Sequence, residues 1–220
     1  MKNDFTKTYL FSCPIYKIRI DPNSYDKEKI INDIKYNKSL KNTRNAPHQT
    51  IGIPSDIHHS FQDFDNEDFR PINYEKLADV YLETYKNFLS KELYTEKVTF
   101  GFTFEIVNYS AISEGQTLPP HSHVSESFAT IHYLNFKDDH NLTIFKNPAI
   151  FAPYLIHLQP ELDDILDDLV SDNSYLYEYF SLPVKEDDII IFPAALSHEI
   201  APQGPTKEPR ITISSNIRIE

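Results

Sequence analysis

The sequence of 220 residues contains a single cysteine, Cys13. One cysteine cannot form a disulfide within the chain and cannot by itself build a thiolate metal cluster, so both devices are excluded. Low cysteine content fits a reducing compartment. We therefore expect Cys13 to be a core thiol and the protein to be cytoplasmic.

Long apolar runs are also missing. The apolar stretch within the first 20 residues is short, and Ser12, Pro14, Lys17 and Arg19 interrupt it, which is typical of neither a signal peptide nor a spanning helix. No other run approaches the roughly 18 apolar residues that a membrane span requires. The sequence predicts a soluble protein with no membrane partner.

Basic residues are outnumbered, with 21 Lys and Arg against 33 Asp and Glu and a net charge of −12. Such a surface repels phosphate backbones and anionic lipids, so we expect no nucleic-acid partner. The acidic residues gather in clusters, which we expect to be solvated faces, at 138–139, 163–164, 167–168 and 186–188.

The composition that remains, 40% hydrophobic and 13% aromatic, supports a packed core and one domain over 1–220. Its first part, 1–93, is predicted to hold a strand and supporting helices. Within 21–40, isoleucines at helical spacing follow Ser24, a candidate N-cap. From Pro71 to about residue 93 an aromatic stripe predicts a second helix that packs on the core.

The second part, 94–220, is rich in short β-forming runs separated by Pro, Asn, Asp and Ser. This pattern predicts a mainly β, α+β fold whose core is an antiparallel sandwich or jelly roll, with the helices as an N-terminal layer. Leucines and an isoleucine at helical spacing predict a short acidic helix inserted near 160–170.

Three histidines stand at the ends of predicted strands. His121 and His123 are two positions apart, so both imidazoles can point the same way, and His198 follows a later strand. A third residue from a neighbouring strand can close one face of a metal, and imidazole suits Fe(II), zinc, nickel and copper. In the last strand, Arg210 can hold the far end of a dicarboxylate through two hydrogen bonds, and the Thr212 hydroxyl can add another.

At these residues the chain resembles the 2-oxoglutarate/Fe(II)-dependent oxygenases, specifically the branch found in bacteria and phages. The similar segments, in the family's order, are "LFSCPIY", "VNYS…EGQTLPPHSHVSESFATIHYL", "FKNP", "DDIIIFPAALSHEIAP" and "RITISSNI". The resemblance implies a double-stranded β-helix, a cupin-like jelly roll. It also implies Fe(II) and 2-oxoglutarate as cofactors, and a hydroxylase-type dioxygenase that couples O2 and 2-oxoglutarate decarboxylation to oxidation of an unknown substrate.

Carried over to this chain, the resemblance assigns His121 and His198 to iron, and Arg210 with Thr212 to the 2-oxoglutarate 5-carboxylate. Most members of the superfamily have Asp or Glu where this chain has His123. Three interpretations stay open: His123 is the third ligand, which we favour; Glu126 supplies a carboxylate; or the ligand lies elsewhere.

Three aromatic side chains adjoin these motifs. Tyr109 and Tyr133 are candidates to line the co-substrate pocket, although strand packing is an alternative for each. His132 lies in the same strand as Tyr133 and can face either the pocket or the opposite side.

Two other classes of function compete with the oxygenase. One is a redox-silent, histidine-rich metal protein of cupin-like form, for which Arg210 and Thr212 have no obvious purpose. The other is a non-catalytic jelly-roll module for binding or assembly. The aromatic helix over 71–92 can serve an interface between copies as well as a core, so a homo-oligomer stays open.

Overall fold

The computed structural model describes residues 13–40, 47–48, 53–54, 58–60, 63, 66–92, 101–149 and 178–220. The helix expected near 160–170 lies outside these residues. Within them, no helix has the length and apolar character needed to cross a membrane. The helices are a 3₁₀ helix at Pro22–Ser24, α1 at Lys27–Ser39 and α2 at Glu75–Glu92. The strands are β1 Tyr16–Arg19, β2 Pro47–His48, β3 Ile53–Pro54, β4 His58–His59, β5 Phe102–Ile112, β6 Leu118–His121, β7 Phe128–Asn135, β8 Thr143–Lys146, β9 Tyr179–Ser181, β10 Asp188–Pro193, β11 His198–Ile200 and β12 Arg210–Ile219.

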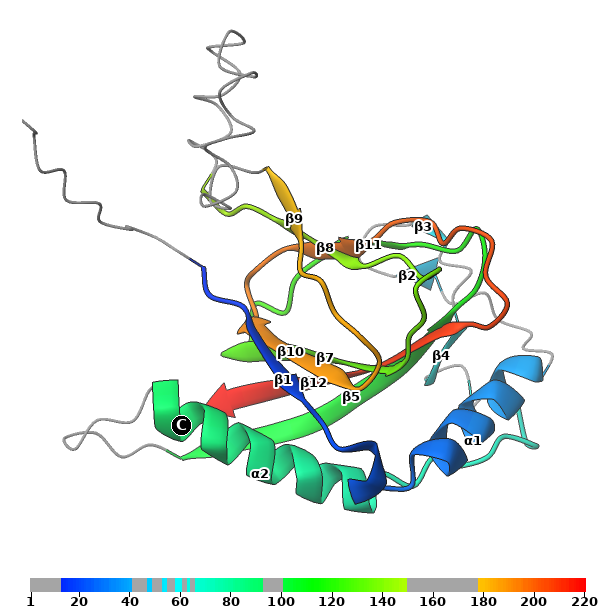
Figure 1. Cartoon of the computed structure of the whole chain (residues 1–220), viewed down its shortest axis with the longest axis horizontal. Helices are drawn as coiled ribbons and strands as arrows, with labels where there is room; N and C mark the ends of the chain where they lie inside the picture. The colour runs from blue at the N-terminus through cyan, green and yellow to red at the C-terminus, as the bar shows by residue number, and fades with distance from the viewer. Residues whose placement is uncertain are drawn as a thin grey trace, which may run out of the picture.

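The strands form two antiparallel sheets that face each other. The larger sheet has the order β1-β10-β7-β12-β5-β4 and the smaller sheet the order β6-β11-β8-β9, while β2 and β3 pair separately. Figure 1 shows the smaller sheet stacked over one face of the larger one, with α1 and α2 along the opposite face. This arrangement confirms the predicted antiparallel two-sheet core with a helical layer. Strand order jumps across the chain, as expected when consecutive strands alternate between sheets.

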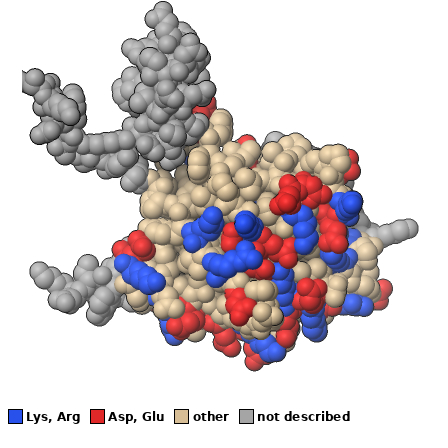
Figure 2. Space-filling view, in the orientation of Figure 1, with Lys and Arg blue, Asp and Glu red and all other residues tan. Residues whose placement is uncertain are grey.

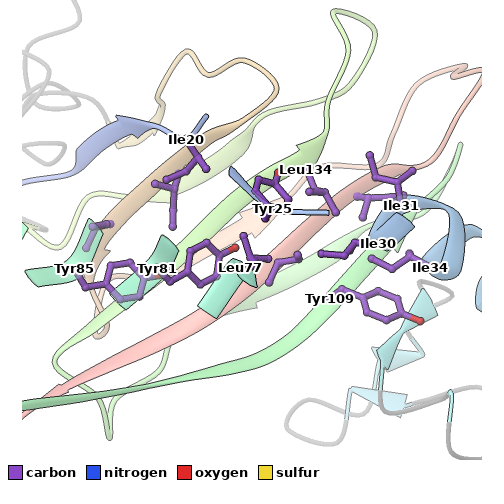
Figure 3. Packing of buried hydrophobic residues seen from close by; sticks show 14 of the residues in the cluster. Ile20, Tyr25, Ile30, Ile31, Ile34, Leu77, Tyr81, Tyr85, Tyr109 and Leu134 are labelled. Atoms are coloured by element: carbon purple, nitrogen blue, oxygen red, sulfur yellow. The ribbon is translucent and has the colours of Figure 1, made fainter. Parts of the chain in front are cut away.

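Helix α2 packs on the larger sheet through the aromatic stripe that the sequence predicted. Leu77, Tyr81 and Tyr85 are fully buried, and Figure 3 shows them beneath the strands together with isoleucines of α1. The Tyr85 hydroxyl bonds Ser215 Oγ at 2.5 Å and Thr130 Oγ1 at 3.0 Å, so its polar end is satisfied on the sheet. The stripe is therefore core in this chain.

Helix α1 begins three residues later than its predicted cap. Ser24 lies in the 3₁₀ helix, and the N-cap of α1 is Asp26, whose side chain makes no capping bond. The expectation for Ser24 was wrong because Asp21 and Pro22 start the shorter helix first. The Ser24 hydroxyl then donates to the Asp21 carbonyl at 2.6 Å, within the short helix.

The acidic cluster at 186–188 is not a solvated face, contrary to expectation. Asp187, in the turn before β10, and Asp188, the first residue of β10, are buried, because this part of the chain faces the N-terminus of α1. There Asp187 pairs with the buried Lys27, and Asp188 accepts from Arg19 at 3.2 Å. Burying these carboxylates is tolerable because each has a cationic partner. Elsewhere, acidic and basic side chains are interspersed on the face shown in Figure 2.

His132 of β7 faces the helical layer and not the space between the sheets. It is fully buried, and its Nδ1 bonds the Tyr81 hydroxyl of α2 at 2.8 Å. Burial, with a smaller contribution from the Lys27 charge, lowers the pKa of His132 to about 3. His132 therefore stays neutral in the folded protein at any pH near neutrality.

The depressed pKa of His132 predicts that stability falls as the pH is lowered from 7 to 5. Below its ordinary pKa of 6.5, the unfolded chain binds a proton that folded His132 excludes, so the free energy of unfolding decreases. In His132→Leu the free energy of unfolding should change less steeply with pH. The slope should be smaller by up to about 1.4 kcal/mol per pH unit, which corresponds to one proton. Urea unfolding of both proteins at pH 7, 6 and 5 measures the two slopes, and equal slopes would contradict the prediction.

Candidate functional site: three histidines and a buried arginine

The structure brings His121, His123 and His198 together. Each offers a ring nitrogen, and these nitrogens all lie within 4.8 Å of one another. The pairing of β6 with β11 causes this, because it sets His198 directly opposite His121. His123 follows β6 by two residues, and its ring centroid lies 5.4 Å from that of His121 and 5.5 Å from that of His198. The predicted proximity of the three is confirmed.

Backbone carbonyls orient two of the three imidazoles. His121 Nδ1 lies 2.9 Å from the Pro119 carbonyl oxygen, and His198 Nδ1 lies 3.0 Å from that of Leu196. A carbonyl only accepts, so Nδ1 of each ring carries the proton and the lone pair is on Nε2. Burial, aided by the neighbouring His121 and His123, lowers the pKa of His198 to about 3. The group is thus suited to a metal that binds neutral imidazole.

Glu126 has a different partner. Its carboxylate accepts from Arg218 at 2.7 Å and from the Ser125 hydroxyl at 3.1 Å. The Arg218 hydrogen bond is the main reason that the pKa of Glu126 lies below its usual range. The carboxylate that the sequence left open as a third ligand is therefore engaged with a guanidinium, while His123 joins the other two imidazoles.

Arg210, at the start of β12, is fully buried without a carboxylate partner among the described residues. Its Nη2 donates to Thr143 Oγ1 at 3.0 Å, whereas Nε and Nη1 are buried without a hydrogen bond. The rings of Tyr133 and Phe136 lie 5.1 and 5.8 Å from its Cζ. A buried cation with free donors is costly, and an anion would offset that cost.

The two parts of the site share one interior. His198 contacts the ring of Phe192, with centroids 4.9 Å apart, and Phe192 belongs to the same buried cluster as Tyr133. That cluster lies between the sheets, since Tyr133 is on β7 of the larger sheet and Phe145 is on β8 of the smaller one. The histidines and the arginine therefore line the same side of the larger sheet.

The other predicted co-substrate residues divide between the two faces of the sheet. Tyr133 lies beside Arg210, and its hydroxyl donates to Thr143 Oγ1 at 2.8 Å. Thr212 is buried, but its hydroxyl shares a hydrogen bond with Ser110 at 2.9 Å and none with Arg210. Tyr109 is not brought to this group. It packs with the helix-facing core (Figure 3), and its hydroxyl donates to Asp63.

Sequence reasoning missed Thr143. Its hydroxyl accepts from both Arg210 and Tyr133, which makes it the hub of this polar group. Thr143 begins β8, 67 residues before Arg210, and nothing in its local pattern differs from that of an ordinary strand threonine. Only the stacking of the two sheets brings it to the guanidinium.

Comparison with known proteins places this site in a family. Residues 108–216, which include every residue of the histidine and arginine groups, match the family model described as "Putative 2OG-Fe(II) oxygenase". Through this region the chain belongs to the 2-oxoglutarate/Fe(II) oxygenases. Fe(II) is the family's metal, and 2-oxoglutarate is its co-substrate. No curated protein sequence matches the chain significantly.

Solved structures agree on the fold. A prolyl-4-hydroxylase from Pseudomonas putida is 9% identical, with 93% of this chain and 92% of that chain covered and a TM-score of 0.50. A viral collagen prolyl hydroxylase from Paramecium bursaria Chlorella virus-1, in complex with 2-oxoglutarate, is 14% identical, with 92% and 94% covered and a TM-score of 0.51. A Trichoplax adhaerens prolyl hydroxylase is 8% identical, with 93% and 83% covered and a TM-score of 0.51. At these identities the likeness is one of fold, and it confirms the double-stranded β-helix.

The hub position of Thr143 predicts a stability cost when its hydroxyl is removed. In Thr143→Val, a buried guanidinium donor and the Tyr133 hydroxyl both lose their acceptor, so the free energy of unfolding should fall by about 1–3 kcal/mol. Thr143→Ser retains the hydroxyl and should lose less. Urea unfolding of the three proteins tests this, and a valine variant as stable as wild type would contradict it.

Proposed function

We propose that this protein is a hydroxylase-type dioxygenase in which His121, His123 and His198 hold Fe(II) and Arg210 holds 2-oxoglutarate. The observation that carries the proposal is the buried Arg210, with two donor nitrogens unused and no carboxylate partner in the part of the chain that the structure describes. A dianionic co-substrate would supply the missing partner. Fe(II) and 2-oxoglutarate, once bound, supply the oxidising chemistry that couples O2 and decarboxylation to oxidation of a further substrate.

The donor set fits the metal. Non-haem Fe(II) oxygenases use three protein ligands on one face of the ion and leave positions for co-substrate and oxygen. Here the backbone carbonyls of Pro119 and Leu196 already orient His121 and His198 and leave the lone pair of each imidazole on Nε2. Second-shell acceptors of this kind fix the tautomer and raise the basicity of the ligand.

The residues around Arg210 fit the co-substrate. A guanidinium can bind a carboxylate through two parallel hydrogen bonds, from Nη2 together with either Nε or Nη1. Thr143 takes one of the two N–H bonds of Nη2, and Nε and Nη1 have no hydrogen bond, so one such donor pair of Arg210 remains. Thr143 holds Nη2 and so orients the guanidinium plane. The aromatic rings of Tyr133 and Phe136 exclude water from the group, which strengthens its attraction for an anion.

Three neutral imidazoles change the charge of the metal site. Relative to two histidines and a carboxylate, the site is one unit more positive, so it should attract dianionic 2-oxoglutarate more strongly. The same change alters the electronic tuning of the iron. A redox-silent metal protein would account for the histidines but not for Arg210, and a non-catalytic module would account for neither. The low cysteine content also supports a reducing, cytoplasmic compartment.

The proposal predicts that 2-oxoglutarate binding requires both Arg210 and the metal. Under anaerobic conditions, addition of Fe(II) and then 2-oxoglutarate should produce the weak visible absorption of an Fe(II)-bound 2-oxo acid. Arg210→Leu should weaken the apparent affinity for 2-oxoglutarate by roughly tenfold or more, since hydrogen bonds to a charged group contribute about 1.5–3 kcal/mol. His198→Ala should abolish the absorption.

Arg19→Leu serves as the matched control, because Arg19 is exposed and pairs with Asp187 and Asp188 on the far side of β10. Circular dichroism of each variant establishes that it is folded. If Arg210→Leu binds 2-oxoglutarate as wild type does, the assignment of Arg210 is wrong. If wild type binds iron without the absorption, the oxygenase proposal itself fails.

The third ligand is tested by a pair of substitutions at neighbouring positions. His123→Ala should reduce the affinity for Co(II), a stand-in for Fe(II) that tolerates air, by at least about tenfold, because one of three ligands is lost. Glu126→Gln should change it by less than about twofold, because Glu126 is bound to Arg218. Isothermal titration provides both constants. A larger loss in the Glu126 variant would identify a carboxylate ligand instead.

A further inference from the structure

One of the three histidines lacks the carbonyl that orients the other two. His121 and His198 each direct Nδ1 at the backbone oxygen two residues earlier. Among the described residues, no backbone carbonyl receives a hydrogen bond from the His123 ring. A metal-binding imidazole needs an acceptor for its other nitrogen, because that acceptor decides which nitrogen carries the proton.

The segment that carries His123 is tied to the end of β12. The Ser127 amide donates to the Ile217 carbonyl at 3.0 Å, and the Ile219 amide donates to the Ser127 hydroxyl at 3.1 Å. The ion pair of Glu126 with Arg218 adds a third tie. Three consecutive residues of β12 thus hold the segment, and the residue just before them is Asn216.

Asn216 points into the space between the sheets. Its neighbour Ser215 bonds Tyr85 on the helical side, and successive side chains of a strand point to opposite faces. Its register partner on β7 is Ala129, which belongs to the cluster between the sheets. Asn216 is only 8% exposed, and its Oδ1 is buried without a hydrogen bond of normal geometry. A buried amide oxygen without a hydrogen-bond donor is destabilising, so its presence here calls for an explanation.

Asn216 and His123 face the same space between the sheets, because the residues after Asn216 hold the segment that carries His123, and the His123 ring lies 5.5 Å from that of His198. Burial lowers the pKa of His123, and the Asn216 side chain acts in the opposite direction, as a hydrogen-bond acceptor for the ring does.

We propose that Asn216 is a positioning residue that accepts a hydrogen bond from His123 through Oδ1 and turns the opposite ring nitrogen toward the metal. The inference rests on the proposed function and deepens it. A carboxylate at position 123 would need no such acceptor, because it has no proton to place. Asn216 therefore serves the imidazole at position 123, and it completes a set in which each of the three ligands has its own orienting oxygen.

The test is the affinity of the full-length protein for Co(II), measured by titration without 2-oxoglutarate or O2. Asn216→Leu keeps the side-chain volume and removes the acceptor, and it should weaken Co(II) binding by about 10–100-fold, the usual effect of losing an outer-shell partner. Asn216→Asp keeps an acceptor and should retain wild-type affinity or exceed it. Ser214→Ala, on the same face of β12, is the control and should bind as wild type does.

A double-mutant cycle separates positioning from a general structural effect. In the His123→Ala background, Asn216→Leu should cause no further loss of affinity, because the ring that Asn216 orients is absent. Wild-type affinity in Asn216→Leu, equal losses in the Leu and Asp variants, or an undiminished loss in the His123→Ala background would each overturn the inference. If Asn216→Leu does not fold, Asn216→Ser, whose shorter hydroxyl cannot reach the ring, takes its place.

The outcomes distinguish this inference from the proposed function. If wild type binds no Co(II), the metal site proposed above fails and the role of Asn216 fails with it. If wild type binds Co(II) and His198→Ala does not, the metal site stands, and the Asn216 variants alone decide the inference.

Discussion

The alternation of side chains along β12 is the constraint on which the rest of the structure depends. This strand pairs with β5 on one side and β7 on the other. Ile211, Ile213 and Ile217 face the helical layer, while Arg210 and Asn216 face the smaller sheet. Because the period is two, a slip of one residue in register would move the polar set into the apolar core beneath the helices. The helical packing and the site therefore stabilise the same register.

Electrostatics sets the cost of this arrangement. Arg210, which has no carboxylate partner among the described residues, and His198 are buried between the two sheets, while His121 and His123 are partly exposed beside them. The fold offsets part of the cost through the hydroxyl of Thr143 and the carbonyls that bond His121 and His198. The rest is offset by apolar burial in the helical layer. The unused donors of Arg210 and the lone pairs of the imidazoles are the groups that an anion and a metal cation would bind.

Much of the site could be predicted because its residues stand at recognisable places in local patterns. His121 and His123 are two residues apart at a strand end, and Arg210 opens the last strand. Patterns that depend on surroundings were less informative. Ser24 has the side chain of an N-cap, but Asp21 and Pro22 begin a 3₁₀ helix that includes it. Asp187 has the character of a surface acid, but its ion pair with Lys27 allows it to be buried. Tyr109 was a candidate for the co-substrate pocket, but it pairs with Ile213 of β12 and faces the helical layer with it. The pattern along β5 alone does not decide which side of the sheet Tyr109 faces.

The sequence by itself determined which residue types are present, the period of each element and the face that each helix buries, because these follow from neighbours along the chain. Only the tertiary structure decided which distant groups meet. The pairing of β6 with β11 brings His198 to His121, and the stacking of the sheets brings Thr143 to Arg210. These contacts join residues more than 60 positions apart, and local spacing carries no information on which strands become neighbours.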